Sequence, residues 1–319
     1  MNAKHHEQAR TIVQAHTHLA LNPGAVDRLE RPDIYRRVAN HSDDLETHIA
    51  PAEPTKHPSV YPAVWTACLA LDFAPDDARC IAQAWQRQTE RTGHFDPAAW
   101  PTEAQDFDLP PWPHPDAFAP CPLQLGLYAV APNTAWVGRL ARAGVPTVQL
   151  RFKSDDTDLI AQEVNAARAA VQNTSSRLFI NDHWQAAIEA NAYGVHLGQE
   201  DLATADLGAL RAAGLRLGIS SHGYAEMLRA AAQRPSYIAM GTVFATTLKR
   251  MATPPQGVAR LTVYQRMLRH IPTVAIGGID LARVNAVLAS GVGSVAVVRA
   301  LMGADDPEAA VRAFQSRWP

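Results

Sequence analysis

Short apolar runs and longer amphipathic segments alternate along the C-terminal part of the chain. The runs have the length and composition of strands, and the segments between them, such as TDLIAQEVNAARAAVQ and ARVNAVLASG, have helical spacing. The predicted strands lie at about 124–131, 147–153, 177–182, 194–199, 216–222, 237–243, 273–278 and 294–300. Eight β/α units in roughly 200 residues favour an α/β fold of the (β/α)₈ TIM-barrel type. A doubly wound sheet also alternates strands with helices, so periodicity alone leaves that alternative open.

The pattern before these units is different. Residues 1–100 are predicted to form a mainly helical N-terminal extension of unknown role, with helices near 24–39 and 58–92 and a break at DFAPDD. Residues 101–122 contain seven prolines, which prevent regular ladders and favour extended chain. This stretch is predicted to be a linker, packed down by Phe107, Trp112 and Phe118, and residues 123–319 are predicted to be the barrel.

Composition narrows the class of partner. A net charge of −2 gives no electrostatic reason to expect nucleic acid or a membrane surface. The three cysteines fit neither a disulfide framework nor a zinc site, which favours a reducing, cytoplasmic location. The first residues lack the apolar core of a signal peptide, and no run reaches the length of a membrane helix. Small-molecule substrates are therefore expected, and a homo-oligomer is left open.

The stretch VQLRFK places polar and charged side chains on one face of a predicted strand. Alternation puts Gln149, Arg151 and Lys153 on the same face, which in a barrel points into the lumen near its C-terminal rim. A buried charge needs a counter-charge. A guanidinium and an ammonium suit the oxygens of a phosphorylated ligand. Salt bridges to acidic neighbours are the alternative.

Two carboxylates follow the next predicted strands. Asp182 comes after the strand that ends in Asn181, and Asp201 follows Gln199-Glu200 after the strand beyond it. Mg²⁺ commonly takes one or two carboxylates together with phosphate oxygens and water, so this pair is a candidate Mg²⁺ site. The alternative is that each aspartate caps a helix.

The remaining candidates lie after the later strands. Strand 5 ends in a hydroxyl-rich stretch with Ser220, and strand 6 runs into a long loop carrying Thr246, Thr247 and Lys249, which suits a phosphate-gripping lid. Gly277-Gly278 and the segment around Val298 follow strands 7 and 8, the usual phosphate-binding corner of such a barrel. Two anionic groups are expected, one beside the cations and one at this corner.

The motifs QLRFK, FIND, GVHLGQEDL, GISSH, FATTLKRMATPPQG, AIGGI and VAVVRAL occur in this order between about residues 124 and 317. Together they closely resemble the thiamine-phosphate synthase family, with the thiazole tautomerases as close relatives. The resemblance implies a transferase that joins 4-amino-5-hydroxymethyl-2-methylpyrimidine diphosphate to 4-methyl-5-(2-phosphoethyl)thiazole and releases diphosphate. It also implies a dissociative, Mg²⁺-assisted mechanism.

By position, the resemblance assigns roles to most of the candidates. The pyrimidine diphosphate would be held by Gln149, Arg151, Lys153, Asn181 and Lys249, with Ser220 near the pyrimidine and the departing diphosphate, and Mg²⁺ by Asp182 and Asp201. Arg151, Lys153, Ser220 and Lys249 would be the catalytic set. The thiazole phosphate or the lid would be served by Thr246, Thr247, Gly277, Gly278 and Val298.

The chain departs from the family pattern at two places. Leu248 stands where the lid usually has a second hydroxyl, and Arg299 stands where serine is common. A thiazole tautomerase or a non-catalytic thiazole phosphate or thiamine phosphate binder is therefore kept as an alternative. Because the cationic and acidic residues are all present, the resemblance favours the synthase.

Overall fold

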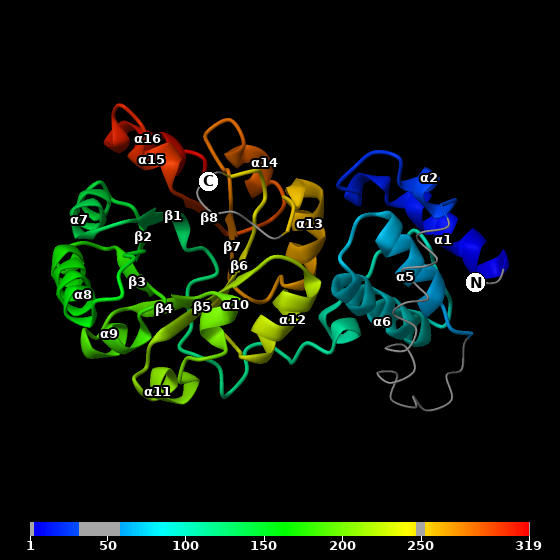
Figure 1. Cartoon of the computed structure of the whole chain (residues 1–319), viewed down its shortest axis with the longest axis horizontal. Coiled ribbons are helices and arrows are strands. Elements are labelled where there is room, and N and C mark those ends of the chain that lie inside the picture. Colours follow the sequence, from blue (N-terminus) through cyan, green and yellow to red (C-terminus); the bar gives the residue numbers. More distant parts are fainter. Residues whose placement is uncertain (1–2, 32–57, 247–252, 319) are drawn as a thin grey trace. The chain divides into compact units, whose positions relative to one another are not determined.

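The computed structural model describes residues 3–31, 58–246 and 253–318 of the chain. These residues form two compact units, 1–110 and 111–319 (Figure 1). The expected N-terminal helical region is present, and each unit has its own core.

The N-terminal unit is built around one helix that is apolar on all sides. Its helices are α1 (Ala3–Ala15), α2 (Ala25–Leu29), α5 (Tyr61–Ala70) and α6 (Pro75–Thr92), with 3₁₀ turns η1 (Thr17–Leu19) and η2 (Ala104–Phe107). Helix α5 has no polar face, so it is stable only when surrounded. It contacts α1, α2 and α6, and most of its residues are buried. The predicted break at DFAPDD separates α5 from α6, whereas most of the predicted helix near 24–39 lies outside the described residues.

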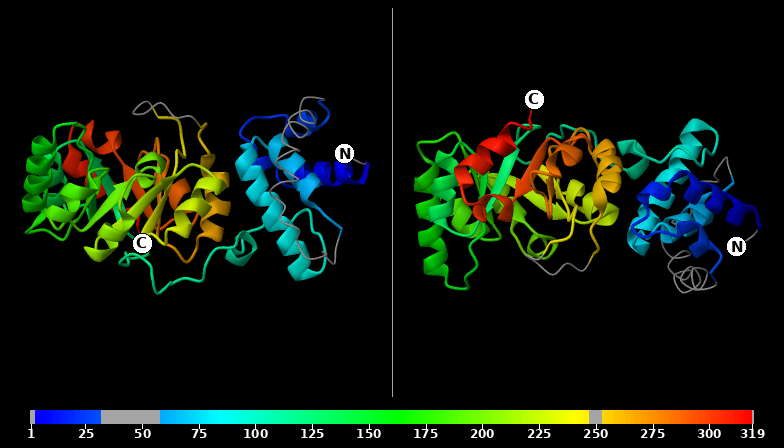
Figure 2. Two further views of the ribbon diagram at one scale, coloured as in Figure 1. Left: turned by 60° about the horizontal axis from the view of Figure 1, so that its bottom comes forward. Right: turned by 90° about the horizontal axis from the view of Figure 1, so that it is seen from above.

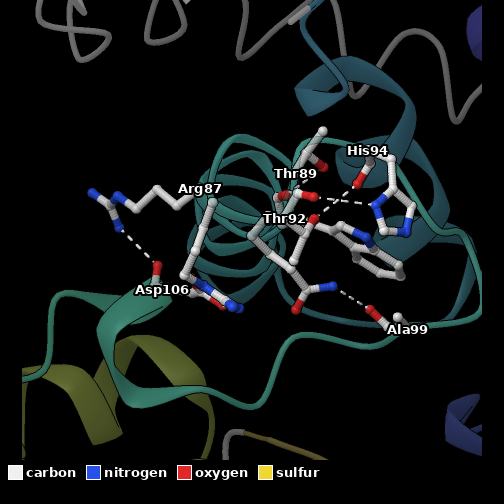
Figure 3. Close-up of polar contacts among 9 residues, drawn as sticks. Arg87, Thr89, Thr92, His94, Ala99 and Asp106 are labelled. Carbon is white, nitrogen blue, oxygen red and sulfur yellow. Dashed lines mark hydrogen bonds and ion pairs between the residues drawn. The ribbon is translucent and has the colours of Figure 1, made fainter. Parts of the chain in front are cut away.

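The C-terminal half of α6 holds the segment that follows it (Figure 3). Arg91 makes two hydrogen bonds to the buried carboxylate of Asp106, at 2.9 and 2.7 Å. Arg87 donates to the Asp106 carbonyl oxygen at 3.1 Å, and Gln88 donates to the Ala99 carbonyl oxygen at 2.7 Å. Residues 94–107 are therefore tied to α6 as part of the N-terminal unit.

The C-terminal unit is a closed barrel of eight parallel strands in the order β1 to β8. The strands are β1 (Gly126–Ala131), β2 (Thr147–Leu150), β3 (Arg177–Asn181), β4 (Gly194–Leu197), β5 (Arg216–Ser221), β6 (Tyr237–Met240), β7 (Thr273–Ile276) and β8 (Ser294–Val297). The predicted (β/α)₈ barrel is confirmed.

Helices surround this barrel on its outside (Figure 2). They are α7 (Thr134–Arg142), α8 (Thr157–Val171), α9 (Trp184–Glu189), α10 (Gln199–Leu202), α11 (Leu207–Ala212), α12 (Tyr224–Ala232), α13 (Gly257–Met267), α14 (Val284–Leu288), α15 (Arg299–Met302) and α16 (Pro307–Gln315). Among the helices of the described ranges, none is both long and apolar enough to cross a bilayer.

The lumen is filled by alternate strand residues. Gln149 on β2 is in register with Val130 of β1 and Phe179 of β3, so these three side chains point to the same side of the sheet. The side chains inside the lumen are mainly apolar and aromatic. The buried cluster includes Leu125, Tyr128, Val130, Phe179, Tyr237, Ala239, Val274 and Ala296. The lumen is therefore a packed core, and a ligand can be held only at its rim.

The segment before β1 packs on the barrel. Phe118 is buried, its N–H donates to the Arg234 carbonyl oxygen at 3.0 Å, and the Arg211 guanidinium lies 4.2 Å from its ring centroid. Ser236 donates to the Ala119 carbonyl oxygen at 2.6 Å. The second half of the proline-rich stretch is thus part of the C-terminal unit.

Candidate active site

The predicted site residues gather at one end of the barrel. Because all eight strands are parallel, their C-terminal ends form a single rim, here called the mouth. The described candidates at or next to strand ends are Gln149, Asn181, Asp182, Asp201, Ser220, Gly277, Gly278 and Val298. Gln149 and Asn181 are buried, and Ser220 is half-buried.

Strand β2 is shorter than predicted, which changes the position of its two cations. The strand ends at Leu150, so Arg151 and Lys153 lie in the loop beyond it and are exposed. The prediction that both belong to the strand was wrong, because the apolar alternation of Leu150 and Phe152 continues past the ladder. Arg151 makes no ion pair with another residue of the described ranges, and its guanidinium is available to a ligand.

Lys153, Asp182 and Asp201 form one polar group at the mouth. Lys153 Nζ lies 2.5 Å from Asp182 Oδ2, and the Asp182 and Asp201 carboxyl groups are close enough to shift each other's pKa. The salt-bridge interpretation of the cations therefore holds for Lys153. The two aspartates, which follow different strands, lie close together as a shared metal site requires.

The two carboxyl groups titrate in opposite directions. Burial alone would raise the pKa of Asp182, but the ammonium of Lys153 keeps that pKa below its usual value. Burial raises the pKa of Asp201, and the negative charge of Asp182 raises it further. A second ionised carboxylate here lacks a sufficient counter-charge.

Neither aspartate is the N-cap of a helix. The N-cap of α9 is His183, and that of α10 is Gly198. Asp201, in the first turn of α10, accepts a hydrogen bond from the Gly198 N–H, which is one half of a capping box. Asp182 has the left-handed φ of 64°, uncommon for a residue with a side chain, and such backbone often occurs at functional sites.

A buried acceptor lies beside this acidic pair. Gln199 of α10 donates through Nε2 to the Ser220 carbonyl oxygen at 2.7 Å. Its Oε1 is buried and has no hydrogen-bond partner within the described part of the chain. Such an atom needs a ligand or a bound water to satisfy it.

The residues present fit a Mg²⁺ ion. No group of three or more histidine, cysteine or acidic side chains that could hold a metal occurs among the described residues. Two adjacent carboxylates, one of them with a raised pKa, match an ion that takes its other ligands from phosphate oxygens and water. Asp182 and Asp201 would hold it.

The two glycines after β7 are required by both conformation and space. Gly277 and Gly278 have φ of 108° and 62°. A Cβ at Gly277 would lie 2.6 Å from the Thr242 Cβ, and one at Gly278 would lie 2.5 Å from the Ala245 carbonyl oxygen. The glycine corner therefore packs directly on the start of the lid loop after β6. Helix α15 begins at Arg299, immediately after Val298.

Only the start of the predicted lid is described. Thr246 is half-buried, while Thr247, Leu248 and Lys249 lie outside the described residues. The predicted roles of these three positions therefore stay predictions. His222, which follows the hydroxyl-rich end of β5, pairs with Glu226 of α12 at 2.7 Å.

A chain of hydrogen bonds crosses the lumen beneath the mouth, here called the lumen chain. Gln149 Nε2 donates to Tyr128 Oη at 3.0 Å, and Tyr128 Oη lies 2.7 Å from Tyr237 Oη. His196 Nδ1 lies 2.7 Å from Tyr237 Oη, and its Nε2 lies 2.8 Å from Ser220 Oγ. Burial lowers the pKa of His196 to about 4, which the charge of Asp182 only partly opposes.

Sequence reasoning missed Tyr128, His196 and Tyr237. Each stands in an otherwise apolar strand, in GLYAVA, GVHL and YIAM, where a polar group needs a partner in the lumen. The sequence therefore gives the signal of a polar group that needs a partner. It does not identify the partners, because each of them lies on a different strand.

A parallel eight-stranded barrel whose mouth combines cations, paired carboxylates and a glycine corner has the architecture of an enzyme acting on phosphorylated small molecules. Comparisons with known proteins agree. The model of the family described as thiamine monophosphate synthase matches residues 127–301. The chain belongs to this family, and the predicted family is confirmed.

Similar proteins cover the barrel. A thiamine-phosphate synthase of Neisseria meningitidis serogroup B is 54% identical over 201 residues, 63% of this chain and 98% of that protein. One of Salmonella dublin is 53% identical over 193 residues, 60% of this chain and 92% of that protein. The solved structure of a thiamine phosphate pyrophosphorylase from Pyrococcus furiosus is 27% identical with a TM-score of 0.53, covering 60% of this chain and 95% of that one.

Proposed function

We propose that the barrel makes thiamine phosphate by joining 4-amino-5-hydroxymethyl-2-methylpyrimidine diphosphate to 4-methyl-5-(2-phosphoethyl)thiazole, with Mg²⁺ and release of diphosphate. Family membership and relatives with 53–54% identity support the product. The observation that carries the mechanism is the polar group of Lys153, Asp182 and Asp201 at the mouth.

The diphosphate would lie over this polar group. Arg151 and Lys153 are exposed on one loop, where a guanidinium can bind two phosphate oxygens and an ammonium a third. Asp182 and Asp201 would hold Mg²⁺, which when bound stabilises negative charge on the phosphate oxygens. With the ligand in place, Lys153 turns from Asp182 to the diphosphate.

Bond breaking places negative charge on the leaving diphosphate. Fixed positive groups stabilise this charge as it develops and so lower the barrier. This stabilisation is the main source of catalysis in a dissociative reaction. Arg151 and Lys153 supply this charge, together with Lys249 from the lid. The pyrimidine methylene carbon that remains is then captured by the thiazole nitrogen. No protein nucleophile is required, and Ser220 serves as a hydrogen-bonding group.

The thiazole phosphate would lie at the glycine corner. Gly277 and Gly278 bring their backbone against the start of the lid loop where a side chain would clash, and the loops after strands 7 and 8 commonly bind phosphate in such barrels. Val298 and Thr246 border the same corner.

The experiment is to mix the two substrates with Mg²⁺ and the full-length protein and to look for thiamine phosphate and diphosphate by chromatography. Product that disappears when Mg²⁺ is chelated supports the proposal. A protein that isomerises a thiazole phosphate without consuming the pyrimidine diphosphate is a tautomerase, and one that binds without turnover is a sensor. Either result would overturn it.

A further inference from the structure

The placement of the Gln149 amide gives the lumen chain one direction, which follows from counting its protons. Tyr128 Oη accepts from the amide of Gln149, so its own proton goes to Tyr237, its other partner in the chain. Tyr237 must then donate to His196 Nδ1. His196 therefore carries its proton on Nε2 and donates to Ser220 Oγ.

This direction determines which hydrogen-bonding groups the two end residues of the lumen chain leave free for a ligand. Gln149 directs its amide nitrogen into the lumen, toward Tyr128 and Tyr237, and keeps its carbonyl oxygen for another partner. Ser220 accepts inside the lumen and keeps its O–H to donate elsewhere. Gln149 therefore offers an acceptor and Ser220 offers a donor.

The opposite direction is the one alternative that satisfies every group. If the Gln149 amide turns over, Tyr128 donates to its oxygen, Tyr237 donates to Tyr128, and His196 donates from Nδ1 to Tyr237. Ser220 then donates to His196 Nε2. Gln149 now offers an N–H, and Ser220 offers lone pairs.

Burial excludes mixed states, in which some hydrogen bonds of the lumen chain point one way and the others point the opposite way. Tyr128, Tyr237 and His196 are 1%, 0% and 8% exposed, so water cannot satisfy a group whose neighbour points the wrong way. In a mixed state two protons or two lone pairs face each other, which is costly in a dry lumen. A doubly protonated His196 produces such a state. It donates from both ring nitrogens, so the hydrogen bonds on its two sides point in opposite directions along the lumen chain.

The barrel makes room for this arrangement. A Cβ at Gly218 on β5 would lie 2.1 Å from the Tyr237 ring. The ring therefore occupies the side-chain space of a neighbouring strand and reaches the middle of the lumen. Gly218 thus allows Tyr237 to bridge Tyr128 and His196.

We propose that the lumen chain couples the hydrogen-bonding polarity of Gln149 to that of Ser220, so that the mouth selects a 4-aminopyrimidine over a 4-oxopyrimidine. The inference rests on the proposed function and adds an explanation of how the mouth selects its pyrimidine substrate. In the direction set by the Gln149 amide, the Gln149 oxygen accepts from an exocyclic amine, and Ser220 donates to a ring nitrogen. A 4-oxo ring exchanges donor and acceptor and requires all five groups to reverse.

Tyr128, Tyr237 and His196 are on this account positioning residues, because they act through Gln149 and Ser220. Tyr237→Phe cuts the chain at its centre. Tyr128 then keeps a partner only by donating to Gln149, which turns the amide N–H toward the mouth. The preference for an amine is lost while the ring remains in place.

The first test measures binding without turnover. The dissociation constants of the 4-amino and 4-oxo pyrimidine diphosphates are measured by calorimetry with the full-length protein and Mg²⁺, leaving out the thiazole phosphate. Wild type should prefer the amino compound, and Tyr237→Phe should reduce the ratio by roughly tenfold or more. Tyr128→Phe is the second variant, expected to reduce it in the same direction.

The matched control is Thr147→Val. It removes a buried hydroxyl that donates to the Leu125 carbonyl oxygen at 3.0 Å, at the N-terminal end of the strand that carries Gln149 and outside the lumen chain. Its ratio should equal that of wild type. Unchanged ratios in both tyrosine variants would overturn the proposal, even if their melting temperatures fall.

The second test reads the histidine directly. Nitrogen-15 spectra of the wild-type protein, with His196 assigned by its loss in His196→Gln, should show a neutral ring protonated on Nε2 when the amino compound is bound. A ring protonated on Nδ1 or on both nitrogens would overturn the proposal. Neither test uses turnover, so a protein that passes both but makes no thiamine phosphate disproves only the proposed function.

Discussion

Lys153 Nζ and Asp182 Oδ2 are 2.5 Å apart at the mouth of the barrel, in a contact that joins the loops after β2 and β3. The same ammonium is proposed to bind the diphosphate, and the same carboxylate is proposed to hold Mg²⁺. On this proposal, ligand binding would replace the internal ion pair with one contact to the diphosphate and one to Mg²⁺.

Lys153→Ala should lower kcat/KM for the pyrimidine diphosphate by roughly a hundredfold or more, because it removes a positive charge that meets the leaving group. The melting temperature should change little, since Lys153 is 57% exposed and exposed ion pairs contribute little to stability. Steady-state kinetics and thermal unfolding check both parts. Lys4→Ala, in the N-terminal unit, is the control for the loss of one lysine. Wild-type kinetics in Lys153→Ala would remove this residue from the site.

Asp182→Ala should abolish Mg²⁺-dependent turnover while the barrel stays folded. The reason is that Asp182 supplies one of the two carboxylates and is proposed to be a direct metal ligand. Product formation at several Mg²⁺ concentrations, with circular dichroism as the folding check, measures this. Near-normal activity would contradict the metal assignment.

Asp201→Asn should separate stability from function. The raised pKa of Asp201 means that its ionised form is unfavourable in the folded chain, so its charge lowers stability at neutral pH, and this effect disappears as the pH falls through that raised pKa. In the presence of a chelator the variant should be as stable as wild type or more stable, by up to about 1 kcal/mol. Mg²⁺ binding should be lost. Urea unfolding and metal titration measure the two effects, and a variant clearly less stable than wild type would refute the explanation.

The same raised pKa predicts how Mg²⁺ affinity depends on pH. Asp201 must be ionised to bind the ion, so affinity should fall on acidification at a pH above the usual range of an aspartate. Asp182, whose pKa is lowered, should stay ionised over this interval. Calorimetric titrations of Mg²⁺ at several pH values test this, and affinity that is constant down to the ordinary aspartate pKa would count against it.

Gly278→Ala should weaken thiazole phosphate binding selectively. An alanine there would have a left-handed φ and a Cβ 2.5 Å from the Ala245 carbonyl oxygen, at a cost of about 2 kcal/mol or more. KM for the thiazole phosphate should rise well above that for the pyrimidine diphosphate. Gly214→Ala, which also has a positive φ but meets no atom within 4 Å, controls for backbone strain alone. Equal changes in both KM values would argue against a phosphate site at this corner.

A fragment of residues 111–319 should fold and make thiamine phosphate, because it contains the whole C-terminal unit. A fragment that begins at residue 120 should be less stable, since it lacks Phe118 and the Ala119 carbonyl oxygen that accepts from Ser236. Thermal unfolding and activity of the two fragments test this. Insolubility of the longer fragment would show that the barrel needs the N-terminal region.

The sequence predicts the barrel well because each strand carries its own local pattern. It predicts the rim residues because a strand end fixes which loop they occupy. It fails where the outcome depends on partners distant in sequence. The apolar alternation at Phe152 does not reveal that the ladder has already ended at Leu150, and nothing local to His196 or Tyr237 announces that they meet in the lumen.

The space that Gly218 leaves for the Tyr237 ring has a consequence for how such barrels diverge. A methyl group at position 218 and a phenol at position 237 cannot coexist unless the ring is displaced from its place in the lumen. Substitutions at the two positions should therefore be inherited together. A homologue with a side chain at position 218 of the fifth strand is expected to have a smaller residue at position 237 of the sixth strand.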